Sequence, residues 1–370
     1  GRAAAGRVSA LYRLVRRTLF RLDAERAHHL ALRSAALAEW LLEHGAQGVV
    51  PAAPPGDPVT ILGRTFPNRV GLAAGFDKNG IAPHLWSRLG FGFAELGTVT
   101  ARPQPGNPQP RMFRLPAEHA VVNRLGFNNQ GAEEVARRLR YRLEVRPAIP
   151  IGLNIGCSKV SVGDEAAERE DYRFSARLLA PLADYLAINV SSPNTPGLRN
   201  LHEPRRLARL VEAVLREIEV LAVAAPVPVL VKLSPDLADE DIPAICAAAR
   251  DGGAAGFIAT NTTITRPGCT SPAAGETGGL SGAPLRARAT DVLRRVRDAV
   301  GDGVPIIGVG GVTTIDDVHE KLAAGADLVA LYTALIYEGP LLPRRLARGI
   351  SPTAVRVSAS VPRESASAGR

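Results

Sequence analysis

The stretch that decides the fold is Ala187-Ile188-Asn189-Val190-Ser191-Ser192-Pro193-Asn194-Thr195-Pro196-Gly197, which follows Ala183-Asp184-Tyr185-Leu186. An apolar run here ends abruptly in amides and hydroxyls, as a buried strand does where it reaches the rim of a sheet. Two amides at such a rim can hold a flat polar ligand, and a hydroxyl between them can move a proton. An Asn-Pro surface turn is the alternative interpretation.

Seven other apolar runs end in the same way. The eight runs cover residues 70–75, 93–98, 149–154, 185–192, 229–233, 256–260, 305–310 and 328–332, and helical stretches separate them. Near-continuous apolar strands that alternate with helices are typical of a parallel sheet buried on both faces. Eight such units predict an α/β fold, a (β/α)8 TIM barrel. A doubly wound sheet competes, but its glycine fingerprint is missing after the first run.

The composition is compatible with one large core and excludes few partners. The chain has 370 residues, 46% of them hydrophobic, and a formal charge of +9. The basic residues are arginines except for Lys78, Lys159, Lys232 and Lys321, so the net charge carries little weight. Nucleic acid is the weakest partner, because no stripe of aromatic and basic residues appears. Cys157, Cys246 and Cys269 are scattered, so no metal and no disulfide framework is expected.

A helical hairpin is expected before the barrel, over residues 8–45. Leu11, Leu14, Val15 and Leu19 recur at helical spacing, and Asp23 is a suitable N-cap for a second helix that ends at Gly45. The hairpin either lies on an anionic membrane surface or caps the bottom of the barrel. We therefore expect an extension over 1–50, a barrel over 59–349, and a disordered tail over 350–370. The long connection 99–148 is expected to be functional.

The ends of the predicted strands carry the chemistry. They present lysines, amides, hydroxyls and glycines to one rim, where a lone Asn or Thr could equally cap a helix. Gly310-Gly311, Gly278–Gly282 and the helix start after residue 332 offer backbone amides to a phosphate. A lysine near a ring would stabilise charge on a reduced flavin. A sugar-phosphate isomerase would share the phosphate site.

Ser192 needs a special substrate if it removes a proton. An unactivated hydroxyl is a poor base, and no His or Asp stands beside it in the motif. Proton removal therefore requires concerted loss of a hydride, which points to dehydrogenation of a carbon–carbon bond next to a carbonyl. A hydroxyl that stabilises a turn is the alternative.

From about residue 10 to 345 the chain resembles the quinone-dependent (class 2) dihydroorotate dehydrogenases. The motifs that carry the resemblance are 71–80, 97–114, 123–129, 189–198, 278–282, 308–311 and Tyr332-Thr333. The resemblance implies oxidation of (S)-dihydroorotate to orotate by FMN with a membrane quinone as acceptor, in de novo pyrimidine (UMP) biosynthesis. It also implies a peripheral, monomeric enzyme on the cytoplasmic face of the cell membrane. The soluble class carries cysteine where Ser192 stands.

The resemblance implies roles for individual residues. Ser192 falls on the catalytic base, which takes the C5 proton while C6 passes hydride to the flavin. His28, Arg114 and Tyr332 fall on the quinone tunnel. The substrate positions are Lys78, Asn123, Arg124, Leu125, Gly126, Phe127, Asn189, Asn194, Asn261 and Thr262. The FMN positions are Ala74, Gly75, Phe76, Asp77, Lys78, Thr98, Asn154, Asn189, Lys232, Thr260, Gly282, Gly311, Tyr332 and Thr333.

Two features depart from the family pattern. Ala330 and Ala334 stand where the family often has glutamine and glycine, and no closing helical sequence follows Gly349. Another FMN barrel, acting on a different pyrimidine or using fumarate or NAD, stays open as an alternative. So does a barrel that binds phosphate without redox chemistry, although it would not need both Lys78 and Lys232.

Overall fold

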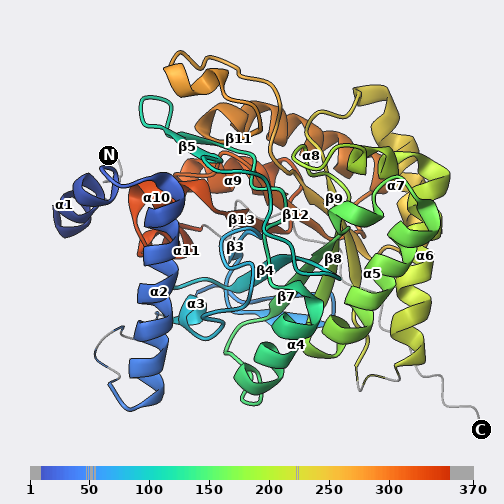
Figure 1. Ribbon diagram of the computed structural model, residues 1–370, viewed down its shortest axis with the longest axis horizontal. Helices are drawn as coiled ribbons and strands as arrows, with labels where there is room; N and C mark the ends of the chain where they lie inside the picture. Colours follow the sequence, from blue (N-terminus) through green and yellow to red (C-terminus); the bar gives the residue numbers. More distant parts are fainter. Residues whose placement is uncertain are drawn as a thin grey trace, which may run out of the picture.

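A computed structural model describes residues 10–350 except 47, 49, 51, 52, 54, 55, 222 and 224. Its centre is a closed barrel in the order β10-β12-β13-β3-β4-β7-β8-β9, with every neighbouring pair parallel (Figure 1). The predicted (β/α)8 barrel is therefore confirmed, and the doubly wound alternative is excluded. The strands are β3 (Val70–Leu72), β4 (Phe93–Thr100), β7 (Ile151–Gly156), β8 (Tyr185–Asn189), β9 (Val229–Leu233), β10 (Gly256–Ala259), β12 (Ile306–Val309) and β13 (Leu328–Leu331).

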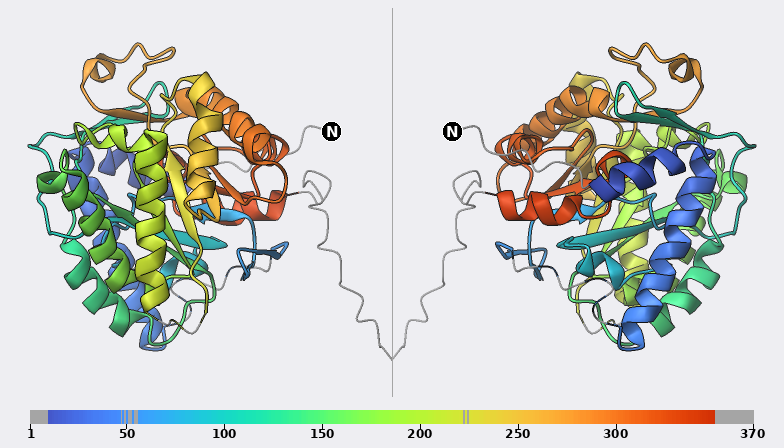
Figure 2. Two further views of the ribbon diagram at one scale, coloured as in Figure 1. Left: turned by 90° about the vertical axis from the view of Figure 1, so that its right-hand side faces the viewer. Right: turned by 90° about the vertical axis from the view of Figure 1, so that its left-hand side faces the viewer.

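Helices surround the barrel, with α5 and α6 on the side opposite the N-terminal helices (Figure 2). The spacing of Leu207, Leu210, Val211 and Val214 places all four on the buried face of α6. The helices that follow the hairpin are α3 (Leu85–Arg88), α4 (Gly131–Arg142), α5 (Glu165–Leu179), α6 (Pro204–Val220), α7 (Ile242–Asp251), α8 (Arg286–Val300), α9 (Ile315–Ala323), α10 (Thr333–Glu338) and α11 (Leu342–Gly349). Short 3-10 turns are η1 (Lys159–Ser161), η2 (Ala180–Leu182), η3 (Leu198–His202), η4 (Asp239–Asp241), η5 (Pro272–Gly275) and η6 (Ala283–Leu285).

The last seam of the barrel is closed although the chain departs from its family there. β13 pairs with β3 in parallel, and α11 packs against this seam with Leu342 and Leu346 buried. The described residues up to Gly349 therefore close the seam. The expected tail falls outside the described residues apart from Ile350.

Aromatic rings fill the lower part of the barrel. A Cβ on Gly71 would lie 2.1 Å from the ring of Phe93, and one on Gly152 would lie 2.1 Å from the ring of Tyr185. Each glycine thus makes room for a ring from the neighbouring strand. The hairpin of β1 (Val59–Ile61) and β2 (Arg64–Phe66) packs against this cluster and closes the bottom. The sequence analysis missed this hairpin, and its position excludes the helical hairpin as the bottom cap.

The long connection after β4 contains most of a second small sheet. Strands β5 (Met112–Leu115) and β6 (Ala120–Asn123) form a hairpin, and β11 (Gly279–Gly282) pairs antiparallel with β6. Residues 279–282 of the glycine-rich run 278–282 therefore form a strand, although the run was expected only as a source of backbone amides. Helix α4 completes the connection.

The predicted helical hairpin is present as α1 (Ala10–Leu19) and α2 (Ala24–Glu43), with α2 beside α3 (Figure 1). Asp23 caps α2 as predicted, because its Oδ1 accepts hydrogen bonds from the backbone N–H groups of Glu25 and Arg26, both at 3.0 Å. The side of α2 that packs inward carries Glu25, Glu39 and Leu42, whereas Leu30 and Leu37 are exposed. In the described part of the chain, no helix is both long enough and apolar enough to cross a bilayer.

Candidate active site

One cavity lies over the carboxyl ends of the barrel strands, between the barrel and the small sheet. Most of the candidate residues line it, although they come from segments far apart in the sequence. The cavity brings together Ala74, Gly75, Lys78, Thr98, Asn123, Leu125, Gly126, Phe127, Asn189, Ser192, Asn194, Lys232, Thr260, Asn261, Thr262, Gly282, Gly311, Tyr332 and Thr333. Ala330 and Ala334, the two departures from the family pattern, line it as well.

The floor of the cavity is a buried polar network. The Thr98 hydroxyl donates to Asn154 Oδ1 at 2.6 Å and accepts from Asn189 Nδ2 at 2.9 Å. Asn154 Nδ2 donates to Glu95 Oε1 at 2.9 Å, and Lys232 Nζ forms an ion pair with the same oxygen at 3.3 Å. Each amide is therefore held in a single orientation, and the Lys232 cation has a buried counter-charge.

Glu95 is a functional residue that the sequence analysis missed. Its signal was present, because a carboxylate stands between apolar neighbours in the run Phe93-Ala94-Glu95-Leu96. A buried acid is rarely tolerated without a partner. The buried partner here is Lys232, a rim residue of β9. It lies 137 positions from Glu95 in the sequence, so the pairing could not be recognised from the sequence.

Amides also hold the upper side of the cavity. Asn194 Nδ2 donates to Asn123 Oδ1 at 3.2 Å, and Asn261 Nδ2 donates to Ser191 Oγ at 2.9 Å and to Asn189 Oδ1 at 3.2 Å. Asn107, which was not predicted, donates from Nδ2 to the carbonyl of Asn194 at 3.2 Å. The segments after β8 and β10 and the β5–β6 hairpin are thus joined over the barrel.

Lys78 lies in the cavity with its Nζ donating to Asn128 Oδ1 at 2.7 Å. Burial lowers the pKa of Lys78 to about 8; the negative charge of Glu25 opposes this shift and the cation of Arg111 assists it. Lys78 is therefore a cation below pH 8.

Ser192 is buried at the cavity wall. Its Oγ accepts a hydrogen bond from the backbone N–H of Asn194 at 3.2 Å. Within the described residues, no imidazole or carboxylate forms a hydrogen bond with this hydroxyl, so the geometry does not provide a hydrolase triad. The role of Ser192 in proton transfer stays a prediction.

Four of the predicted substrate and FMN residues lie outside this cavity. Asp77 is fully buried, and its carboxylate accepts from the backbone N–H groups of Ile81 and Ala82, so it stabilises a turn. Asn154 belongs to the floor network but is fully buried behind the residues that line the cavity. The Arg124 guanidinium points to Glu276 at 2.6 Å and lies over the ring of Phe113. The ring of Phe76 lies against Trp86 and Tyr332.

A second cavity of about 300 Å³ lies between α2 and the barrel. His28 and Phe76 line it, with ring centroids 5.1 Å apart, and the His28 ring lies 6.2 Å from that of Tyr332. Burial lowers the pKa of His28 to about 3, so its imidazole is neutral at pH 7. Lys78, Met112 and Leu125 line both cavities, which are therefore neighbours.

Arg114 does not line the described cavities, contrary to its expected place in a quinone tunnel. Its guanidinium donates to the carbonyl oxygens of Leu19, at 3.0 Å, and Leu22, and it lies over the ring of Phe20. Arg114 therefore fixes the turn between α1 and α2. The acceptors for its guanidinium are backbone carbonyls, and a sequence pattern cannot predict which carbonyls a side chain will reach.

Comparisons with known proteins agree with this geometry. Residues 58–353 match the family model for dihydroorotate dehydrogenase. A Nocardioides protein named dihydroorotate dehydrogenase (quinone) is 52% identical over 344 residues, which cover 90% of this chain and 95% of the relative. A protein of the same name from Novosphingobium aromaticivorans is 48% identical, covering 92% and 94%.

Solved structures give the same result. The structure of DHODH from Eimeria tenella in complex with ferulenol has a TM-score of 0.77 and 37% identity, and the match covers 87% of this chain and 89% of that one. The ligand-free form from the same organism also has a TM-score of 0.77, with 39% identity and coverage of 85% and 92%. The chain belongs to the dihydroorotate dehydrogenase family.

Proposed function

We propose that this protein oxidises dihydroorotate to orotate with FMN and passes the electrons to a quinone, in de novo pyrimidine biosynthesis. The observation that carries the proposal is the meeting of Lys78, Ser192 and Lys232 in one cavity, with a second cavity on the other side of shared walls. The first cavity suits the substrate and flavin, and the second suits a quinone. The relatives named dihydroorotate dehydrogenase (quinone) support this assignment.

The residues of the first cavity fit a flavin. The floor offers fixed amides and a cation, and hydroxyls of Ser281 and Thr333 lie together at its far side, 2.8 Å apart. The buried Tyr332 Oη has no hydrogen-bond partner among the described residues, which is the state expected of a donor that faces a ligand. The flavin, when bound, supplies the acceptor for the hydride that leaves the substrate.

The chain's own residues bind the substrate and handle its proton. Asn123, Asn194 and Asn261 offer amide donors and acceptors to a pyrimidine ring, and the Lys78 cation balances the substrate's negative charge. Ser192 Oγ takes the proton from the carbon next to the carbonyl. The Lys232 cation, held by Glu95, stabilises negative charge that develops over the floor.

A direct experiment tests the proposal. Purified protein should be yellow, dihydroorotate alone should bleach it, and a soluble quinone should restore the colour. Fumarate and NAD should fail to restore it. Protein that retains FMN but is not bleached by dihydroorotate would contradict the substrate assignment, and restoration by fumarate or NAD alone would contradict the acceptor.

We also propose that α1 binds an anionic membrane surface. Leu11, Leu14 and Val15 are exposed by 73, 64 and 41%, while Tyr12 and Arg16 on the same helix bond to carbonyls of α10. The apolar face of α1 therefore points away from the barrel with exposed Arg13 and Arg17 beside it. This combination is typical of a helix that lies in a membrane interface.

A further inference from the structure

Ser192 lies on a loop whose conformation must be fixed by contacts with the rest of the protein. The serine loop, residues 190–203, joins β8 to α6, and in the proposed function it carries the base. A base that is displaced by about 1 Å can lose a factor of about 10² in rate. The contacts that fix the loop therefore bear on the chemistry as much as the hydroxyl itself.

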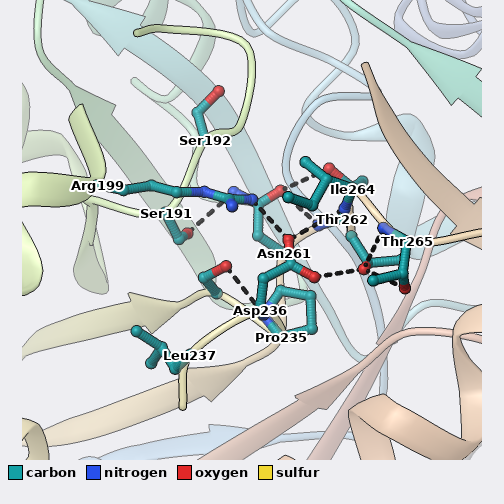
Figure 3. Close-up of polar contacts among 12 residues, drawn as sticks. Ser191, Ser192, Arg199, Pro235, Asp236, Leu237, Asn261, Thr262, Ile264 and Thr265 are labelled. Carbon is teal, nitrogen blue, oxygen red and sulfur yellow. Dashed lines mark hydrogen bonds and ion pairs between the residues drawn. The ribbon is translucent and has the colours of Figure 1, made fainter. Parts of the chain in front are cut away.

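A carboxylate outside the cavity joins the serine loop to two other loops. Asp236 follows β9, and its Oδ2 forms an ion pair with Arg199 of the serine loop at 2.8 Å (Figure 3). The same oxygen accepts from the backbone N–H of Ile264 at 3.0 Å, and Oδ1 accepts from the hydroxyl of Thr263. The Asp236 side chain is 10% exposed and that of Arg199 28%, so this pair is partly protected from screening by salt.

The position of this carboxylate links it to both halves of the substrate site. Thr263 and Ile264 directly follow the substrate candidates Asn261 and Thr262. Arg199 is one residue beyond Leu198, whose buried side chain and backbone bond to the carbonyl of Thr195 anchor the turn over 195–198, three residues beyond Ser192 in the serine loop. The other side of the turn is tied by the neutral bond from Asn107 to Asn194.

We infer that Asp236 is a positioning residue that holds Ser192 on one side of the substrate and Asn261–Thr262 on the other. It acts through Arg199 on the serine loop and through Thr263 and Ile264 on the loop after β10. In Figure 3 the Ser192 hydroxyl points away from the Asp236 cluster, so the carboxylate exerts its effect through the backbone and not as a second base. This inference rests on the proposed function.

The kinetic test separates the two half-reactions. In Arg199→Met and Asp236→Asn, bleaching of the flavin by dihydroorotate should slow about 10- to 100-fold. Arg199→Lys, which keeps the charge, should fall between these variants and the wild type. Reoxidation of the reduced flavin by a soluble quinone should be unchanged in all three, because the second cavity does not include the serine loop.

Arg206→Met is the matched control. Arg206 lies in the first turn of α6 and pairs with Glu168 at 2.5 Å, with side chains 23% and 1% exposed. Arg206→Met therefore removes a comparable ion pair whose two side chains lie outside the serine loop. Its bleaching rate should stay at the wild-type value. Equal bleaching in wild type and Arg199→Met would overturn the inference, as would an equal loss in Arg206→Met. Failure of dihydroorotate to bleach the wild type would instead overturn the proposed function.

A second measurement does not depend on the flavin. Trypsin can cleave after Arg199, and Asp236→Asn keeps this site while it removes the charge that holds it. Cleavage between Arg199 and Asn200 should be faster in Asp236→Asn than in the wild type, with cleavage elsewhere unchanged. An unchanged cleavage rate at this bond in a folded variant would show that Asp236 does not restrain the loop.

Discussion

Ser192 reaches the cavity with only a backbone N–H as its partner in the described structure, so its contribution is that of an unassisted hydroxyl. Ser192→Ala should slow bleaching of the flavin by dihydroorotate about 10²- to 10⁴-fold, since this is the usual contribution of a general base. Stopped-flow absorbance of the flavin measures this step directly.

Ser192→Cys serves as the matched variant, because a thiol is more acidic than an alcohol and retains a proton acceptor at the same place. It should bleach faster than the alanine variant. Reoxidation by quinone should be equal in all three proteins. A wild-type bleaching rate in Ser192→Ala would remove this serine from the proton transfer.

Lys78 gives the site a predicted pH dependence. Its pKa is lowered to about 8 by burial, so the cation is present below pH 8 and is lost above it. Orotate, an anion, should bind with constant affinity from pH 6.5 to 7.5 and then more weakly, by at most about tenfold per pH unit above the pKa. Titration of the flavin absorbance with orotate measures this.

Lys78→Gln provides the control for that titration. It should bind orotate more weakly at pH 7, and its affinity should not change between pH 6.5 and 9. If the variant kept the wild-type pH profile, another group would have to be responsible for it.

Helix α2 is joined to the barrel by carboxylates as well as by apolar packing. Glu39 Oε2 accepts from the backbone N–H groups of His84 and Leu85, both at 2.8 Å, and Arg142 lies 3.4 Å from Oε1. Burial raises the pKa of Glu39 to about 7 from 4.5. The folded state therefore holds this proton more tightly than the unfolded state, and the resulting stability is lost as the pH rises from 4.5 through 7.

The difference in Tm between the wild type and Glu39→Gln should follow this dependence. The wild type should lose its advantage progressively between pH 5 and 7, and the difference should be constant above pH 7.5. Differential scanning fluorimetry of both proteins across pH 5–8 measures it. A constant difference over the whole range would mean that Glu39 does not titrate in the folded protein.

The elements also show what the sequence could predict. Barrel strands such as β9 were located to the residue, because a run buried on both faces leaves a continuous apolar signal. The three-residue strands β1 and β2 carry too short a pattern, and β11 contains two glycines that suggest a loop. The buried face of α2 carries Glu25 and Glu39, whose charges a sequence pattern would assign to solvent.

The same physical limit applies to the site. Residues at strand ends, such as Lys78, Asn189 and Lys232, could be identified because the barrel brings those ends together. Glu95, Asn107 and Asp236 could not, because their roles depend on partners between 27 and 137 positions away. Arg114 was assigned to a tunnel and instead bonds to carbonyls, which every residue carries and no sequence pattern distinguishes.

For the molecule as a whole, the exposed face of α1 predicts reversible binding to lipid. The protein should sediment with vesicles that contain anionic lipid and less with neutral vesicles, and added salt should weaken binding. Leu14→Glu should reduce sedimentation several-fold without changing dye reduction by dihydroorotate, because Leu14 is remote from both cavities.

Val220→Glu is the control for a new negative charge at an exposed apolar site, since Val220 ends α6 and is 82% exposed. It should sediment like the wild type. Equal sedimentation of Leu14→Glu and wild type would show that α1 does not touch the lipid.

The first and second cavities share three lining residues, Lys78, Met112 and Leu125. A movement of these side chains therefore changes the shape of both cavities. A bulky compound bound in the second cavity, beneath α2, would press on side chains that also line the first cavity. Met112 is flexible enough to transmit that pressure by changing rotamer. The apparent potency of an inhibitor that binds in one cavity should therefore depend on whether the other cavity is occupied. Such inhibitors should be compared both with and without a ligand in the other cavity.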